Sequence, residues 1–163
     1  MANQWGYDEK FMQEQNHPLW RNDLMKPSKA KLGPKGCFIT NVRYAKSRIV
    51  NKMYGVKEVN QQMSIIVGYT ENGDAKWDAV KKVLGLTISK AKPSKAKSAI
   101  ITMRNVLVRD INNNFTSHWV TELKGGLMYD PLKTGGNFVH RIDFFAPVFA
   151  APGLINRRYV YVA

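Results

Sequence analysis

The chain lacks several features that mark common classes of protein. It has one cysteine, Cys37, which excludes an internal disulfide, a cysteine-rich zinc site and an all-thiolate iron–sulfur site within one chain. No apolar run reaches the ~18–20 residues that a membrane-spanning helix needs. The first residues show no basic segment followed by an apolar stretch, so no Sec-type signal peptide is expected. Neither of the common glycine-rich phosphate-binding motifs is present.

Acidic residues are scarce relative to basic ones. Lys and Arg number 25 against 12 Asp and Glu, which gives a formal net charge of +13. Such a charge attracts polyanions, whether nucleic acid, anionic lipid or an anionic cell wall, without choosing among them. The hexamer KPSKAK occurs twice and predicts exposed loops, which are either solvated connections or a paired basic rim on one face. The rim would comprise Lys26, Lys29, Lys31, Lys35, Lys92, Lys95 and Lys97.

What the chain does contain is enough apolar material for one core. It has 163 residues, of which 44% are hydrophobic, and this predicts a single domain over residues 1–163. Apolar residues at three- and four-residue steps predict a helix from Cys37 that ends at Gly55. Shorter helices are expected over residues 57–63 and 75–84.

The last third of the chain is typical of strands. Residues 116–123 and 127–129 flank a Lys-Gly-Gly turn, and residues 138–145 and 158–162 alternate. Residues 98–110 are ambiguous, and a helix running into a strand is one interpretation. Helices followed by antiparallel strands indicate an α+β fold. The division that we expect is an N-terminal arm (1–25), a mainly helical part (36–110) and a part of mainly antiparallel strands (111–163).

Cys37 lies at the start of the predicted helix, a position that favours a reactive thiol. It follows Gly36 and opens the predicted helix, whose unpaired N-terminal amides carry about half a positive charge. That charge, with nearby Lys31 and Lys35, would lower the thiol pKa and favour the nucleophilic thiolate. Gly36 would let a substrate backbone approach closely, and the main-chain amide of Cys37 would face a developing oxyanion. The plainer alternative is that Cys37 is a small buried apolar residue.

A thiolate needs a base, and the chain has only three histidines, of which His118 begins a predicted strand. If the hairpin turn centres near Gly125, facing residues have numbers that sum to about 250. Asp130 would then lie one diagonal step from His118 on the same face and would fix its tautomer. The alternatives are a half-exposed strand histidine and an aspartate that merely starts a turn before a proline.

The motifs at these positions resemble those of one family. They are Trp20, Leu32-Gly33, Gly36-Cys37, Ser117-His118-Trp119-Val120 and Tyr129-Asp130-Pro131. In this combination the chain is similar to papain-like cysteine peptidases related to the bacteriocin-leader-processing (double-glycine) enzymes, over residues 20–136.

The resemblance implies a papain-like α+β fold, in which a helical half carrying Cys37 packs on an antiparallel sheet carrying His118 and Asp130. It implies that these three residues form a catalytic triad, with substrate between the halves and no metal or organic cofactor. One departure concerns the oxyanion. Members of the family usually carry a glutamine several residues before the cysteine, and residues 31–36 contain none. Gln15 and Asn22 lie further upstream as candidate donors, and without a donor the chain would be an inactive relative.

The charge and the resemblance together favour a hydrolase that cuts amide bonds in bacterial peptidoglycan. Many phage and bacterial relatives act on cell walls, so we expect a phage endolysin or a virion-associated lysin. Gly36, Trp119, Lys31 and Lys35 are the expected substrate-binding residues, and the basic rim would hold the enzyme at an anionic envelope polymer. The expected location is the cytoplasm of the producing host cell until lysis, or the virion.

Three alternatives stay open at this point. A protein-processing cysteine peptidase would use the same triad on another substrate. A zinc hydrolase would take His118, Asp130 and His140 as ligands, although no compact histidine pair supports it. A basic nucleic-acid-binding protein without catalysis would stack bases on aromatic side chains. The candidates for such stacking are Trp5, Trp20, Trp77, Tyr159 and Tyr161.

Overall fold

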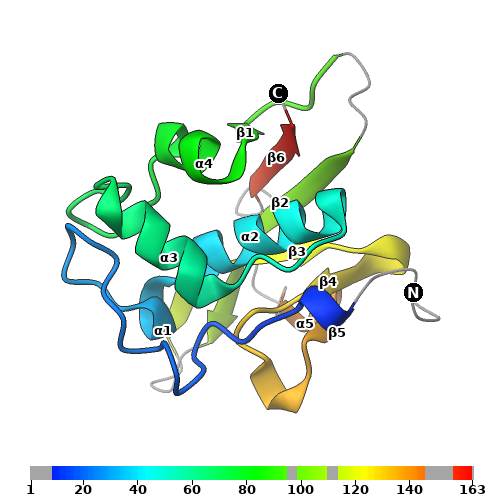
Figure 1. Ribbon diagram of the computed structural model, residues 1–163. Helices are drawn as coiled ribbons and strands as arrows, with labels where there is room; N and C mark the ends of the chain where they lie inside the picture. Colours follow the sequence, from blue (N-terminus) through cyan, green and yellow to red (C-terminus); the bar gives the residue numbers. More distant parts are fainter. Residues whose placement is uncertain (1–8, 95–98, 110–113, 146–155, 163) are drawn as a thin grey trace.

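A computed structural model describes residues 9–94, 99–109, 114–145 and 156–162 (Figure 1). The described residues form a group of helices followed by one six-stranded sheet, in which every strand pairing is antiparallel. The strand order is β1-β6-β2-β3-β4-β5. The α+β class that the sequence predicts is therefore observed.

The helices form where apolar residues recur at helical spacing. In α2 this stripe includes Ile39, Val42 and Ala45, all of which are buried. The helix ends earlier than Gly55, because Asn51 adopts a left-handed conformation with φ 52° and donates its N–H to the Ser47 carbonyl. The helical segments are η1 (Glu9–Phe11), α1 (Leu32–Lys35), α2 (Cys37–Val50), α3 (Val56–Ile65) and α4 (Trp77–Leu84).

The change from helices to strands comes at Gly85, not at residue 111 as the sequence predicted. Gly85 ends α4 with φ 66°, and the next residue begins a strand. The ambiguous segment becomes the long strand β2, because its β-branched residues fill a central position between two neighbouring strands. The remaining elements are β1 (Leu86–Ser89), β2 (Ile100–Arg109), β3 (Phe115–Glu122), η2 (Lys124–Gly126), β4 (Leu127–Tyr129), η3 (Thr134–Gly136), β5 (Val139–Arg141), α5 (Ile142–Phe145) and β6 (Asn156–Val162).

Two details of the predicted strands have different outcomes. The strand expected over residues 138–145 is wrong in its second half, because the chain turns into α5 after Arg141. The hairpin register is confirmed, since Thr121 faces Tyr129 and Glu122 faces Met128. This register depends on Gly125 and Gly126, whose φ values of 72° and 74° favour glycine.

The main core lies between the helices and the sheet. Helix α2 packs along β3 (Figure 1), and its buried stripe meets Met103 and Val160 of the sheet. The described part of the N-terminal arm belongs to this body as well. Arg43 is buried, and its guanidinium donates to the Phe11 carbonyl and to Gln13 Oε1. None of the described helices is long and apolar enough to cross a membrane.

Candidate active site

Cys37 is the first residue of α2, as the sequence predicts. It is half-buried and lines a cavity of about 540 Å³. Gly36 has a structural function at this point. Gly36 is buried, and a side chain there would meet the Leu32 carbonyl oxygen at 2.5 Å. The glycine therefore allows the tight connection between α1 and α2.

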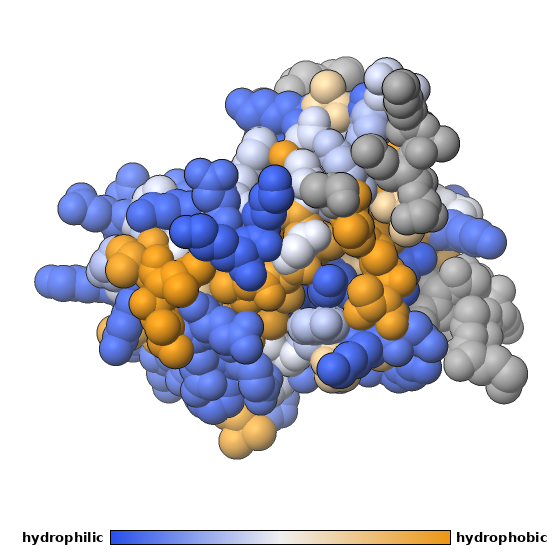
Figure 2. All heavy atoms as spheres, turned by 45° about the horizontal axis from the view of Figure 1, so that its top comes forward, coloured by the Kyte–Doolittle hydropathy of each residue, from blue (hydrophilic) through white to orange (hydrophobic). Residues whose placement is uncertain are grey.

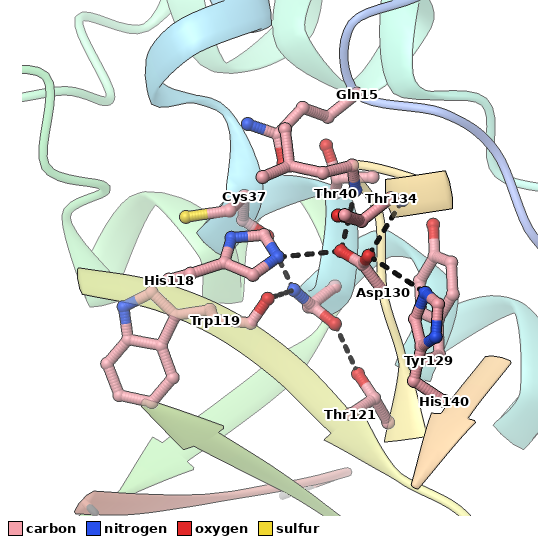
Figure 3. A network of polar contacts seen from close by, with 12 residues as sticks. Gln15, Cys37, Thr40, His118, Trp119, Thr121, Tyr129, Asp130, Thr134 and His140 are labelled. Atoms are coloured by element: carbon pink, nitrogen blue, oxygen red, sulfur yellow. Dashed lines mark hydrogen bonds and ion pairs between the residues drawn. The ribbon is translucent and has the colours of Figure 1, made fainter. Parts of the chain in front are cut away.

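His118 and Asp130 lie together beside Cys37 (Figure 3). His118 is in β3, and Asp130 directly follows β4, whose register places it one diagonal step away. The distance from His118 Nε2 to Asp130 Oδ1 is 2.8 Å. Both side chains are almost fully buried, so this hydrogen bond is shielded from solvent.

The side chain of His118 interacts with the thiol of Cys37, and its Nδ1 is left for this interaction because Nε2 contacts Asp130. Burial raises the pKa of Cys37, but the hydrogen bond and positive charge of His118 outweigh it and bring the pKa below its ordinary value. Main-chain N–H groups of Trp119 and Phe38 act in the same direction. The arrangement therefore favours a thiolate in contact with an imidazolium.

His118 is the other half of this ion pair. Burial lowers the pKa of its imidazole, yet the hydrogen bonds and charges of Asp130 and Cys37 prevail and raise the pKa to about 9. A histidine with this pKa is protonated at neutral pH. It is therefore able to stabilise a thiolate and to give a proton to a leaving group.

Asp130 is held by donors on both carboxylate oxygens. Oδ1 accepts from the main-chain N–H of Leu132 and Oδ2 from that of Thr134, each at 3.0 Å. His140 Nε2 lies a further 3.5 Å from Oδ2. Burial raises the pKa of Asp130, but the hydrogen bond and charge of His118, with the donors from Thr134, bring it below its ordinary value. The carboxylate thus stays ionised and fixes the orientation of His118.

Asn41 is a site residue that the sequence analysis missed. Its Nδ2 donates to the carbonyl oxygens of Cys37, at 2.7 Å, and Trp119, at 2.8 Å. Its Oδ1 accepts from the Thr121 hydroxyl at 2.6 Å. This buried amide joins the start of α2 to β3 and so sets the position of Cys37 relative to His118. The available signal was a polar residue one turn after Cys37 on the helix.

The two candidate oxyanion donors lie in different places. Gln15 is buried, and its Nε2 donates to the Gly33 carbonyl at 2.8 Å while its main-chain N–H donates to the Pro131 carbonyl at 2.8 Å. It lies beside the Cys37–His118 pair (Figure 3). Asn22 is exposed and lines a separate hollow next to α3. Of the two candidates, only Gln15 is brought to the site.

The cavity beside Cys37 contains some of the expected substrate-binding residues. Trp119 and Lys35 line it, whereas Lys31 and Gly36 do not. The sequence analysis did not predict that Trp77 and Arg158 also line it, because they come from α4 and β6. Within the proposed rim, Lys26, Lys29, Lys31, Lys35 and Lys92 are exposed, while Lys95 and Lys97 lie outside the described residues.

The alternative sites receive little support from side-chain geometry. Within the described ranges, no three His, Cys, Asp or Glu side chains are arranged to hold a metal ion. His118 and His140 both direct Nε2 towards Asp130, whose oxygens also accept main-chain N–H groups. Of the aromatic residues considered for stacking, Trp20 lies against His17, and Trp5 lies outside the described part of the chain.

Comparison with known proteins adds no relative. No protein-family model matches the chain, and no curated protein or solved structure matches it significantly. A function for this chain therefore has to be inferred from its own residues and their geometry.

Proposed function

We propose that this chain is a papain-like cysteine hydrolase that cleaves amide bonds, with Cys37 as nucleophile, His118 as acid and base, and Asp130 as the residue that orients His118. One observation carries the proposal: Cys37 interacts with His118, His118 is hydrogen-bonded to the buried carboxylate of Asp130, and Cys37 lines a cavity. Nucleophile, base and orienting group in contact are the requirement for nucleophilic catalysis.

The reaction would proceed in two stages. The Cys37 thiolate attacks the carbonyl carbon, and the electron pair of the C=O bond moves onto oxygen. When the C–N bond breaks, His118 gives its proton to the departing amine, which leaves an acyl group on sulfur. Water then attacks this thioester and gives a proton to His118. The free acid departs, and the thiolate and imidazolium are restored.

The oxyanion would be stabilised by two N–H donors. The main-chain amide of Cys37 is at the first position of α2, where helix amides have no partner within the helix. The second donor is Gln15 Nε2, which carries two protons and uses one on the Gly33 carbonyl. Its fixed, buried position supports this role, because donors that need no reorganisation stabilise a transition state best.

For the substrate we favour peptidoglycan, and we place the enzyme in a phage lysis system or in a virion. The support is the net charge of +13 and the exposed lysines of the basic rim, which suit an anionic envelope. Hydrophilic side chains cover much of the face in Figure 2. The second candidate is a processing peptidase that acts on protein chains, for which the same triad and open cavity suffice.

The test is a solubilisation assay with purified protein. Peptidoglycan and a denatured protein are offered separately, each with a thiol alkylator or a chelator. Because Cys37 is the only cysteine, alkylation reports on this residue alone. We expect wall hydrolysis that the alkylator and Cys37→Ala abolish and the chelator does not affect, in a variant whose circular dichroism is unchanged. Activity retained by Cys37→Ala would disprove the proposal, and cleavage of the protein substrate alone would change the substrate.

A further inference from the structure

The cavity beside Cys37 contains a cation whose function the proposed reaction does not explain. Arg158 lies in β6 and is half-buried. It shares a sheet face with Trp119, because Met103 of β2 pairs with Arg158 on one side and with Thr121, two residues from Trp119, on the other. Arg158 and Trp119 both line the cavity that contains Cys37.

Two aromatic rings hold the guanidinium of Arg158. Its Cζ lies over the Trp119 ring at 5.3 Å from the centroid and over the Trp77 ring at 5.9 Å. A cation–π contact of this kind does not use the N–H donors of the guanidinium, which stay available for hydrogen bonds. The only hydrogen bond that it makes to a described residue runs from Nη1 to the Arg157 carbonyl, so most of its five donors are unused.

The charge of Arg158 also has no acidic partner within the described part of the chain. Of the ion pairs between described residues, none includes Arg158. Cys37 also lines the cavity, and the imidazolium of His118 balances its thiolate. The remaining charged residues of the lining are Lys35 and Asp74, both exposed, so two cations face one carboxylate there. A guanidinium held over two aromatic rings, with unused N–H donors and no acidic partner among the described residues, fits a carboxylate, which it can bind through two parallel hydrogen bonds.

We propose, building on the function proposed above, that Arg158 determines specificity by binding a carboxylate of the substrate. The substrate class would then be an acidic peptide that carries a free carboxylate within reach of the scissile bond. Trp77 and Trp119 hold the guanidinium in place, and Lys35 adds positive charge at the rim of the same cavity.

The test uses Cys37 as a reporter that does not require hydrolysis. N-iodoacetyl derivatives of glycine, γ-aminobutyric acid and ε-aminohexanoic acid place a carboxylate at increasing distance from the alkylated sulfur. Each is compared with its own carboxamide, at about 0.15 M salt so that long-range attraction is screened. Second-order alkylation rates are measured for the wild type, Arg158→Gln, Arg158→Lys and Arg157→Gln. The last is a matched control, since it removes one charge from the same strand at an exposed residue outside the cavity lining.

We expect at least one carboxylate probe to react about tenfold to a hundredfold faster than its amide, the effect of a charge-assisted hydrogen bond. Arg158→Gln should remove this preference, Arg158→Lys should reduce it, and Arg157→Gln should keep it. Equal rates for every acid and amide pair in the wild type would overturn the inference. So would a preference that survives in Arg158→Gln. The ratio of rates tests Arg158, whereas an absolute rate no higher than that of an ordinary thiol would count against the proposed hydrolase.

Discussion

The buried end of the candidate site and its open end are built differently. At the buried end Asp130 accepts from two main-chain N–H groups and from His118, and hardly any of it is exposed. At the open end Arg158 and Lys35 line a cavity without an acidic partner among the described ion pairs. The groups that would move protons therefore find their hydrogen-bond partners within the folded protein. The groups that would select a substrate keep N–H donors that a ligand could use.

Replacing Asp130 breaks the buried end and should have the largest effect. In Asp130→Asn one oxygen becomes an amide nitrogen, which cannot accept from the N–H of Leu132 or Thr134. We expect the hydrolytic rate to fall by about 10³- to 10⁴-fold, the loss typical of an incorrectly oriented histidine. Asp143→Asn is the control, because this exposed carboxylate lies at the start of α5 and pairs only loosely with Arg141. An equal loss in both variants would contradict the assignment of Asp130.

Replacing Gln15, the proposed side-chain oxyanion donor, should give the next largest effect. Removing its side-chain donor in Gln15→Ala should lower kcat by about 10²- to 10³-fold with little change in KM, as for other oxyanion donors. Asn22→Ala should leave both constants unchanged, because Asn22 is exposed in a separate hollow. Steady-state kinetics separate the two constants. A change in KM alone would assign Gln15 to substrate binding instead.

Replacing Asn41 should affect both the stability of the fold and the position of Cys37 relative to His118. Asn41→Leu removes three hydrogen bonds of a buried side chain, so we expect a loss of about 1–3 kcal/mol in the free energy of unfolding. It should also lower kcat by about tenfold to a hundredfold, because Cys37 shifts relative to His118. Asn60→Leu is the matched control: Asn60 is equally buried and donates to the Leu24 carbonyl, outside the site. It should destabilise the protein in urea without changing kcat.

The smallest expected effect is a difference between two pH profiles. The pKa of His118 is raised to about 9, so its imidazolium persists at neutral pH and is lost as the pH rises through that value. Hydrolysis needs this proton for the leaving amine and should fall about tenfold per pH unit above it. Alkylation of Cys37 needs only the thiolate and should not fall there. If both rates rise together through about pH 10, His118 does not act as the acid.

The sequence predicted correctly those helices and turns that begin or end at a glycine or another residue with a strong local preference. Cys37 opens α2 behind Gly36, and the two glycines of the hairpin set the register that places Asp130 near His118. The prediction was wrong where neighbours decide the structure. β2 is a strand because β3 and β6 pair with both of its edges, and no pattern within its own residues contains that information.

The site divides in the same way. Cys37 and His118 could be identified from the sequence, because each is a rare residue type in this chain and lies at the start of a predicted helix or strand. Arg158 and Trp77 could not, since each resembles an ordinary surface residue until β6 and α4 bring them to one cavity. Asn41 was missed because its function depends on three hydrogen-bond partners, of which two lie in β3, far along the chain.

By itself, the sequence determined the helix that begins at Cys37, the turn that follows β3 and the excess of positive charge, because each depends on residues close along the chain or on composition. Only the tertiary structure decided that Cys37 and His118 interact, that Gln15 is buried near them while Asn22 is exposed in a separate hollow, and that a guanidinium over two tryptophan rings lies in the cavity. These placements depend on packing between segments distant in the chain, which local backbone preference does not specify.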